Sequence, residues 1–335
     1  MNNQPATVAA SHNTGIQFMD PVSGEPLYET EKGLVNSEGG VCFPLTGGAV
    51  RVVGGKNYTE NFGFQWNTFT TTQIDEVNAT QQSKDRFLAA TGWDKEDLSG
   101  QTILEVGSGA GRFSRVVLDE TDATLFSVDY SDAVTANHRN NGHYQKRLHL
   151  FQASVYELPF APAQFDKVFC FGVLQHTPDV KKSVEALAAM VRPGGELIVD
   201  FYPLHWYTKL HIKYLLRHFT RKMEHKKLLG LIKNNIDWMI RSSRFFNRIG
   251  LGSITNRIIP IVNLENTYFK QLSPELLREA CILDTFDVYS PEHDQPQPLQ
   301  RVRRWFEELG FEQVFAGYLE HGGRSNLPIV KGMKK

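Results

Sequence analysis

The sequence lacks long hydrophobic runs, a cysteine framework and an excess of charge of one sign. No apolar run approaches the roughly 20 residues that a membrane-spanning helix needs. The three cysteines, Cys42, Cys170 and Cys281, are far apart and indicate neither a disulfide framework nor a metal cluster. The formal charge of −1 gives no overall attraction for nucleic acid. These absences favour a globular protein in which no metal site is expected.

The first residues also lack the features of an export signal. Residues 1–14 are polar and have neither a basic start nor an apolar core, so we expect a loose tail and a cytoplasmic protein. At 335 residues the chain is longer than a typical single domain, which favours one core with sizeable additions.

Short β-rich runs alternate with helix-sized segments between residues 101 and 202, a pattern typical of a parallel sheet covered on both faces. The alternation stops over residues 203–296 and resumes with a helix over 298–309 and two strands. The link between these two strands is too short for a parallel crossover, so they are antiparallel. We therefore predict an α/β fold with a seven-stranded, doubly wound, mostly parallel sheet and an antiparallel last strand. The predicted strands lie at 102–106, 123–129, 148–154, 165–171, 196–202, 312–319 and 327–333.

This pattern divides the chain into five predicted parts. They are a loose tail (1–17), a small ribbon punctuated by glycine and proline (18–56), the core with its N-terminal cap (57–202), a helical lid insertion (203–296) and the end of the core (297–335).

The turn after the first core strand has the composition of a nucleotide-binding loop. Gly107, Gly109 and Gly111 carry no β-carbon, so the chain bends sharply and exposes its N–H groups at the start of the next helix. Asp129 ends the second strand, where a carboxylate accepts hydrogen bonds from ribose hydroxyls. A dinucleotide fingerprint requires glycine where Arg112 stands. The spacing therefore favours S-adenosylmethionine over a nicotinamide dinucleotide.

Five motifs in order resemble those of the class I (Rossmann-like) S-adenosylmethionine-dependent methyltransferases, of the methyltransferase 11 type. The motifs are Glu105 to Phe113, Val128 to Ser131, Leu158 to Phe160, Phe165 to His176 and Arg192 to Glu196. The resemblance implies an enzyme that uses S-adenosylmethionine. It assigns Glu105, Gly107, Ser108, Gly109 and Gly111 to the methionine end, Asp129 to the ribose, Tyr130 to the adenine face, Ser154 and Val155 to the adenine edge, and Phe171 and Gly172 to the sulfonium.

Two segments before the core also resemble elements of such enzymes. The connector that contains Phe64 and Trp66 resembles an element that closes over the cofactor, although an aromatic plug between helix and sheet fits equally well. Residues 18–56 resemble a zinc ribbon. The cysteine positions of that ribbon hold Asp20, Ser23, Asn36 and Gly39, so we predict a degenerate ribbon without metal.

A methyl acceptor that is an alcohol or phenol needs a general base, and we name three candidate catalytic residues. They are His176, just after the fourth strand, and His293 with Asp287 in an acidic loop over 284–294. Structural alternatives remain, because His176 also suits a turn cap and His293 a solvent-exposed loop.

The insertion contains Lys209, Lys213, Arg217 and Arg221 at four-residue spacing, which predicts a basic amphipathic helix over 205–227. Its charged face is either simply solvated or contacts an anionic acceptor or a membrane surface.

We expect methyl transfer to a small-molecule acceptor, at oxygen, on a metabolite, natural product or glycan-type molecule. The alternatives are an RNA methyltransferase, against which the near-zero net charge and the lack of a separate RNA-binding domain count, and a non-catalytic cofactor-binding protein.

Overall fold

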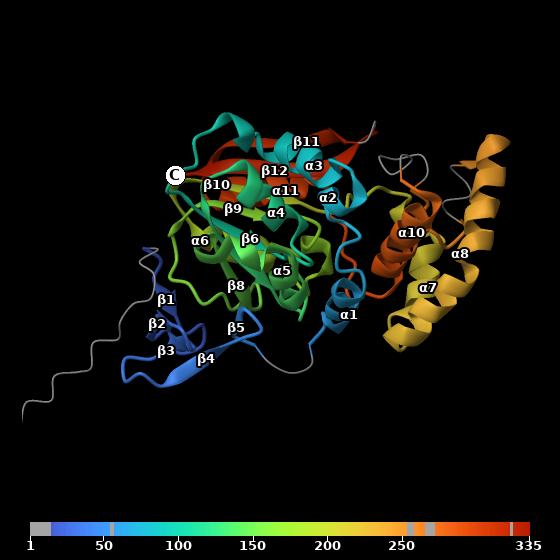
Figure 1. Ribbon diagram of the computed structural model, residues 1–335. Coiled ribbons are helices and arrows are strands. Elements are labelled where there is room, and N and C mark those ends of the chain that lie inside the picture. Colours follow the sequence, from blue (N-terminus) through green and yellow to red (C-terminus); the bar gives the residue numbers. More distant parts are fainter. Residues whose placement is uncertain (1–14, 54–56, 253–257, 265–271, 322–323) are drawn as a thin grey trace, which may run out of the picture.

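The computed structural model describes residues 15–53, 57–252, 258–264, 272–321 and 324–335, and it confirms the predicted sheet (Figure 1). The core strands are β6 (Thr102–Val106), β7 (Thr124–Asp129), β8 (Leu148–Gln152), β9 (Phe165–Cys170), β10 (Val191–Asp200), β11 (Phe311–His321) and β12 (Arg324–Lys334). Their order is β8-β7-β6-β9-β10-β12-β11, and only β12 runs antiparallel to both of its neighbours.

Two hydrophobic clusters cover the two faces of this sheet. Successive residues of a strand point to opposite faces, so Ile103 and Leu104 of β6 belong to different clusters. Helices α3 (Gln82–Thr91) and α4 (Arg112–Glu120) cover the face of Ile103, and α6 (Val180–Met190) and α11 (Leu299–Glu308) cover the face of Leu104. The parallel strands are apolar on both faces because both are buried.

The N-terminal ribbon is an antiparallel meander that extends the core sheet. Its strands are β1 (Phe18–Met19), β2 (Pro26–Thr30), β3 (Gly33–Val35), β4 (Val41–Thr46) and β5 (Ala49–Arg51), and β5 pairs in parallel with β8. The result is a continuous sheet of twelve strands among the described residues.

Side-chain oxygens close the two turns of the ribbon where a zinc ribbon would carry paired cysteines. Asp20 Oδ1 accepts hydrogen bonds from the N–H groups of Val22 and Ser23, at 2.9 and 3.0 Å. Asn36 Oδ1 accepts from the N–H of Gly40 at 2.8 Å and from that of Glu38 at 3.1 Å. Asp and Asn commonly close turns in this way. The kinship with zinc ribbons stays a prediction.

The lid packs as a separate helical layer beside the core, with α8 outermost (Figure 1). Its helices are α7 (Ile212–Thr220), α8 (His225–Arg248) and α10 (Pro274–Tyr289), and α10 contacts both of the others. Shorter helices α1 (Glu60–Thr68), α2 (Asp75–Asn78) and α5 (Val134–Asn141) complete the cap and the core, and α1 lies between core and lid.

Two predictions about the lid are wrong in detail. Residues 205–227 do not form one helix, because His211 is extended (ψ 138°) and a turn after Thr220 separates α7 from α8. Thr220 and Arg217 donate hydrogen bonds to carbonyls at the end of α10, which holds α7 there. The predicted acidic loop is half helical, since Asp284 and Asp287 lie within α10.

A buried polar network lies behind the glycine-rich turn. Glu105 of β6 accepts hydrogen bonds from Ser114 of α4 and from Ser127 of β7, the latter at 2.8 Å. Asn137 of α5 donates to both serines. Asn141 donates to Asn137 Oδ1 and to the carbonyl oxygen of Gly111, both at 2.8 Å. The network therefore ties two strands and two helices to the turn.

The same network explains why residue 111 is glycine. Its φ is 85°, and a β-carbon there would lie 2.2 Å from Asn137 Oδ1 and 2.3 Å from Asn141 Nδ2. Gly111 leaves room for the two asparagines as well as allowing the turn.

We predict that Gly111→Ala destabilises the protein more than Gly92→Ala does. Both glycines have a left-handed conformation, which costs alanine about 1–2 kcal/mol. Only at Gly111 does the β-carbon clash, and overpacking adds about 1–3 kcal/mol. Urea unfolding of both variants measures the difference; equal losses of stability would contradict the role of the asparagines.

We also predict that Glu105 makes stability depend on pH. Burial raises its pKa from 4.5 to about 7, although Ser114 and Ser127 favour the charged form. The stabilisation is therefore complete below about pH 4.5 and is lost as pH rises to about 7, by roughly 3 kcal/mol. Denaturant unfolding between pH 5 and 8 should show a steeper loss for the wild type than for Glu105→Gln. Parallel profiles would refute this assignment.

Candidate functional site

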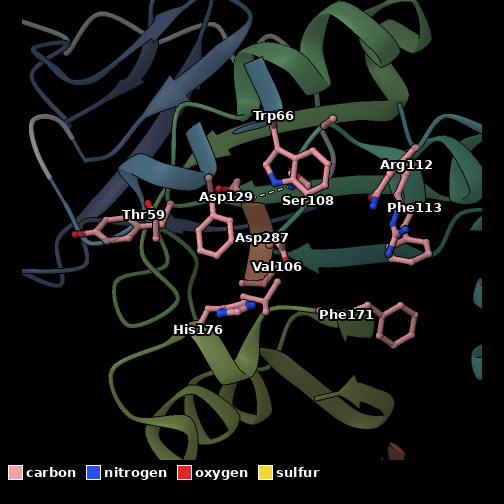
Figure 2. Close-up of a pocket in the computed structure, with 18 of the residues that line it drawn as sticks. Thr59, Trp66, Val106, Ser108, Arg112, Phe113, Asp129, Phe171, His176 and Asp287 are labelled. Atoms are coloured by element: carbon pink, nitrogen blue, oxygen red, sulfur yellow. Dashed lines mark hydrogen bonds between the residues drawn. The ribbon is translucent and has the colours of Figure 1, made fainter. Parts of the chain in front are cut away.

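A cavity of about 310 Å³ opens at the carboxyl ends of β6, β7 and β9, beneath α1 and α10. This is the edge of a doubly wound sheet where ligands bind. Asp129 and Arg112 lie on opposite sides of it, with His176 below them in the view of Figure 2. Of the residues predicted from the sequence, the cavity is lined by Trp66, Gly107, Ser108, Gly109, Asp129, Tyr130, Val155, Phe171, Gly172, His176 and Asp287.

The glycine-rich turn and Asp129 are bound to each other. Asp129 Oδ2 accepts a hydrogen bond from the N–H of Gly109 at 2.8 Å, and its Oδ1 accepts from the N–H and the hydroxyl of Ser131. A carboxylate oxygen accepts two hydrogen bonds, so Oδ2 keeps one position for a ribose hydroxyl. Burial raises the pKa of Asp129 above its usual value.

An unpaired polar atom at the turn also fits a bound cofactor. The hydroxyl oxygen of Ser108 is buried and has no hydrogen-bond partner among the described residues, yet Ser108 lines the cavity. Buried polar atoms normally have partners. A polar group of the cofactor would provide the missing one, so the residues present fit the ligand that the sequence predicts.

The aromatic connector contributes Trp66 to the wall of the cavity. A β-carbon at Gly109 would lie 3.0 Å from Trp66 Nε1, which shows how closely the indole approaches the turn. Tyr58 packs against Tyr130 with ring centroids 5.2 Å apart. Phe64, however, points into the lid, where its ring lies 5.7 Å from that of Phe286.

Five of the predicted site residues do not line the cavity. Glu105 and Gly111 lie behind the turn in the buried network, and Phe64 lies in the lid cluster. The Ser154 hydroxyl accepts from the N–H of Tyr156 at 3.2 Å, although Ala153 and Val155 beside it do line the cavity. The His293 ring packs edge-on against Tyr58 at 5.3 Å.

His176 is held as a neutral imidazole with one free nitrogen. Its Nδ1 lies 3.1 Å from the carbonyl oxygen of His293, which only accepts hydrogen bonds, so Nδ1 carries the proton. Nε2 is therefore an acceptor, and it is buried without a hydrogen-bond partner among the described residues. Burial lowers the pKa of His176, and the opposing effect of Asp287 is smaller. His176 is one of the residues that line the cavity.

Two carboxyls of α10 share this wall with His176. Asp287 accepts hydrogen bonds from Gln65 at 3.0 Å and from the Tyr202 hydroxyl at 3.3 Å. One turn earlier, burial and the charge of Asp287 raise the pKa of Asp284 to about 7. The sequence contained Asp284 in its acidic segment, but only the helical spacing reveals that both acids face the cavity.

Two arginines that sequence reasoning did not assign to the site line the opposite wall. Arg86 of α3 pairs with Asp200, which also accepts from the N–H of Gly172. Arg112 stacks its guanidinium 4.3 Å from the centre of the Phe113 ring and forms no ion pair with a described residue. Burial, followed by the charge of Arg86, lowers its pKa to about 10. In the sequence, the position of Arg112 directly after the glycine-rich turn was the feature that could have indicated its place in the site.

The cations of the predicted basic helix do not form one outward stripe. Lys213 pairs with Asp294 at 2.8 Å. Arg217 is buried, lies 3.8 Å from the same carboxylate and donates to two carbonyls, whereas Arg221 is exposed. This prediction is wrong for the two middle residues, because they bind the end of α10 and the loop after it.

Residues 104–199 match the family described as "Methyltransferase domain". Similar curated proteins include a tRNA U34 carboxymethyltransferase of Idiomarina loihiensis, 28% identical over 110 residues (31% of this chain, 34% of that protein). A ubiquinone biosynthesis O-methyltransferase of Coxiella burnetii is 32% identical over 101 residues (30% and 43%). The chain thus spans less than half the length of the relatives it matches.

Among solved structures, magnesium protoporphyrin IX methyltransferase from Synechocystis, with bound S-adenosylhomocysteine, is 15% identical with a TM-score of 0.44. The match covers 83% of this chain and 97% of that one. The family match coincides with the strands and turn that build the cavity. Residues 104–199 therefore form a methyltransferase domain, and the residues that line its cavity fit S-adenosylmethionine as the cofactor.

Proposed function

We propose that the protein transfers the methyl group of S-adenosylmethionine to an oxygen atom of a small-molecule acceptor, such as a metabolite, natural product or glycan-type molecule. The observation that carries this proposal is the buried, unpartnered Nε2 of His176 in the cavity wall. A hydroxyl nucleophile must lose a proton, and a fixed neutral imidazole accepts one. We also propose that the protein acts in the cytoplasm.

Bound S-adenosylmethionine supplies an electrophilic methyl group on sulfur. The described residues supply orientation: the hydrogen bond from Nδ1 to the His293 carbonyl fixes the imidazole ring, and Phe62 and Tyr202 flank it at 5.1 and 5.5 Å between centroids. Nε2 would accept the proton that the acceptor hydroxyl loses on methylation. The resulting imidazolium is stabilised by the nearby charge of Asp287.

Arg112 is suited to a carboxylate in this scheme. Its guanidinium faces the cavity without an ion-pair partner among the described residues, and an arginine binds a carboxylate through paired N–H donors. The methionine part of the cofactor carries a carboxylate. We therefore assign Arg112 to the methionine end and His176 to the acceptor.

Methylation of RNA is less well supported. Lys213 and Arg217, which would have contacted phosphates, bind Asp294 and backbone carbonyls. If the protein binds S-adenosylmethionine but turns over none of the acceptors, that result would support the alternative of a non-catalytic cofactor-binding protein.

Asp129→Asn and Asp129→Ala should weaken cofactor binding. The neutral amide keeps an acceptor for Gly109 but loses the charge-assisted hydrogen bond to ribose, and about 10- to 100-fold in affinity is expected. Calorimetry with S-adenosylhomocysteine measures this. Asp122→Ala, an exposed acid outside the cavity, serves as the control. Unchanged affinity in both Asp129 variants would contradict the assignment.

His176→Gln should lower turnover by about 10²–10⁴-fold while cofactor affinity stays the same. The assay follows S-adenosylhomocysteine release with pools of hydroxylated small molecules, and with RNA as a second arm. His293→Ala is the matched control, because its backbone carbonyl remains. Full activity of His176→Gln would exclude His176 as the general base. Turnover with RNA but with none of the small molecules would show that the acceptor is RNA.

The same assay tests the pKa of the base. Burial lowers the pKa of His176 from 6.5, so the imidazole stays neutral, and kcat stays on its plateau, down to a pH below 6.5. A decline of kcat that begins above pH 7 would contradict this.

A further inference from the structure

Large apolar side chains are exposed mainly on the lid. Within the part of the chain that the structure describes, ten of the seventeen exposed large hydrophobic residues lie between Trp206 and Ile258. Scattered exposed apolar residues need no explanation, but a concentrated group indicates an interaction surface.

The longest helix of the lid, α8, has two apolar sides. One side packs in the lid cluster with α10 and includes Ile232, Ile236 and Met239. The other carries Leu231, Trp238 and Phe245, which are 50%, 46% and 59% exposed. Residues seven apart lie on nearly the same line of an α-helix, so these three form one outward stripe. In Figure 1, α8 forms the outer edge of the molecule.

The exposed surface of α8 is also strongly basic. Its only acid is Asp237, which pairs with Arg278 at 2.8 Å. The exposed cations along the helix are Lys226, Lys227, Lys233, Arg241, Arg244 and Arg248. An apolar stripe beside a row of cations is the pattern of a helix that lies in the interface of an anionic membrane.

We propose that the outer face of α8 docks the protein on an anionic lipid surface. A second copy of the chain would bring the same six cations against each other, which charge repulsion opposes. A nucleic acid would satisfy the cations but leave Leu231, Trp238 and Phe245 without apolar contacts. None of the helices within the described ranges could cross a bilayer, so the contact is peripheral.

This surface is connected to the cavity through one helix. The side of α10 that packs on α8 belongs to the lid cluster, whereas Asp284 and Asp287 of α10 line the cavity. Docking through α8 would therefore hold the lid side of the cavity near acceptors that are anchored in the membrane. The proposal itself does not require methyl transfer.

The test is cosedimentation of the full chain with phosphatidylcholine vesicles, with and without phosphatidylserine. We expect binding to the anionic vesicles that weakens with salt. Trp238→Ser with Phe245→Ser, and separately Lys233→Glu with Arg241→Glu, should each weaken it by about tenfold or more. Phe315→Ser on β11 removes a 45% exposed aromatic outside the lid and should leave binding unchanged.

Three outcomes would overturn the proposal. The first is no binding to anionic vesicles, or binding that the α8 variants leave unchanged. The second is a dimer in solution that Trp238→Ser with Phe245→Ser converts to monomer. The third is RNA binding that only the charge-reversed variant loses, without vesicle binding. Circular dichroism of each variant establishes that α8 is still folded.

Discussion

The buried carboxyl of Glu105 is the constraint on which the cofactor side of the structure depends. It lies under the glycine-rich turn and is bound by serines from α4 and β7, which Asn137 of α5 joins in turn. Buried polar groups normally have hydrogen-bond partners, so these contacts fix the two strands and the two helices around the turn. The turn is consequently held from behind. The N–H groups of Gly107, Ser108, Gly109 and Gly111 donate to oxygen atoms of the described residues, and the hydroxyl of Ser108 is left for a ligand.

The acceptor side is organised by a different element, the chain that leaves α10. The carbonyl of His293 selects the tautomer of His176, and the carboxylate of Asp294 binds Lys213 and Arg217 of α7. The position of α7 and the orientation of the His176 ring therefore depend on neighbouring residues of one loop, His293 and Asp294. A movement of α7 would disturb that loop, which links any contact made by the lid to the orientation of the proposed base.

The sequence was sufficient to predict the sheet, since the apolar runs and the short last connection leave little choice of topology. It also identified the residues that line the cofactor side, such as Gly109 and Asp129. It could not show that Glu105 and Gly111 belong to a network behind the turn, because Asn137 and Asn141 lie far along the chain. Nor could four-residue spacing reveal that Arg217 is buried, since that depends on carbonyls contributed by α10.

The two turns of the N-terminal meander have a consequence for where this extension can fold. Asp20 and Asn36 close them with oxygen atoms, and the one cysteine in the ribbon, Cys42, is exposed and unbridged. The turns are therefore held by oxygen atoms of the ribbon itself. The strands between them can join the edge of the sheet through β5, whose backbone pairs with that of β8.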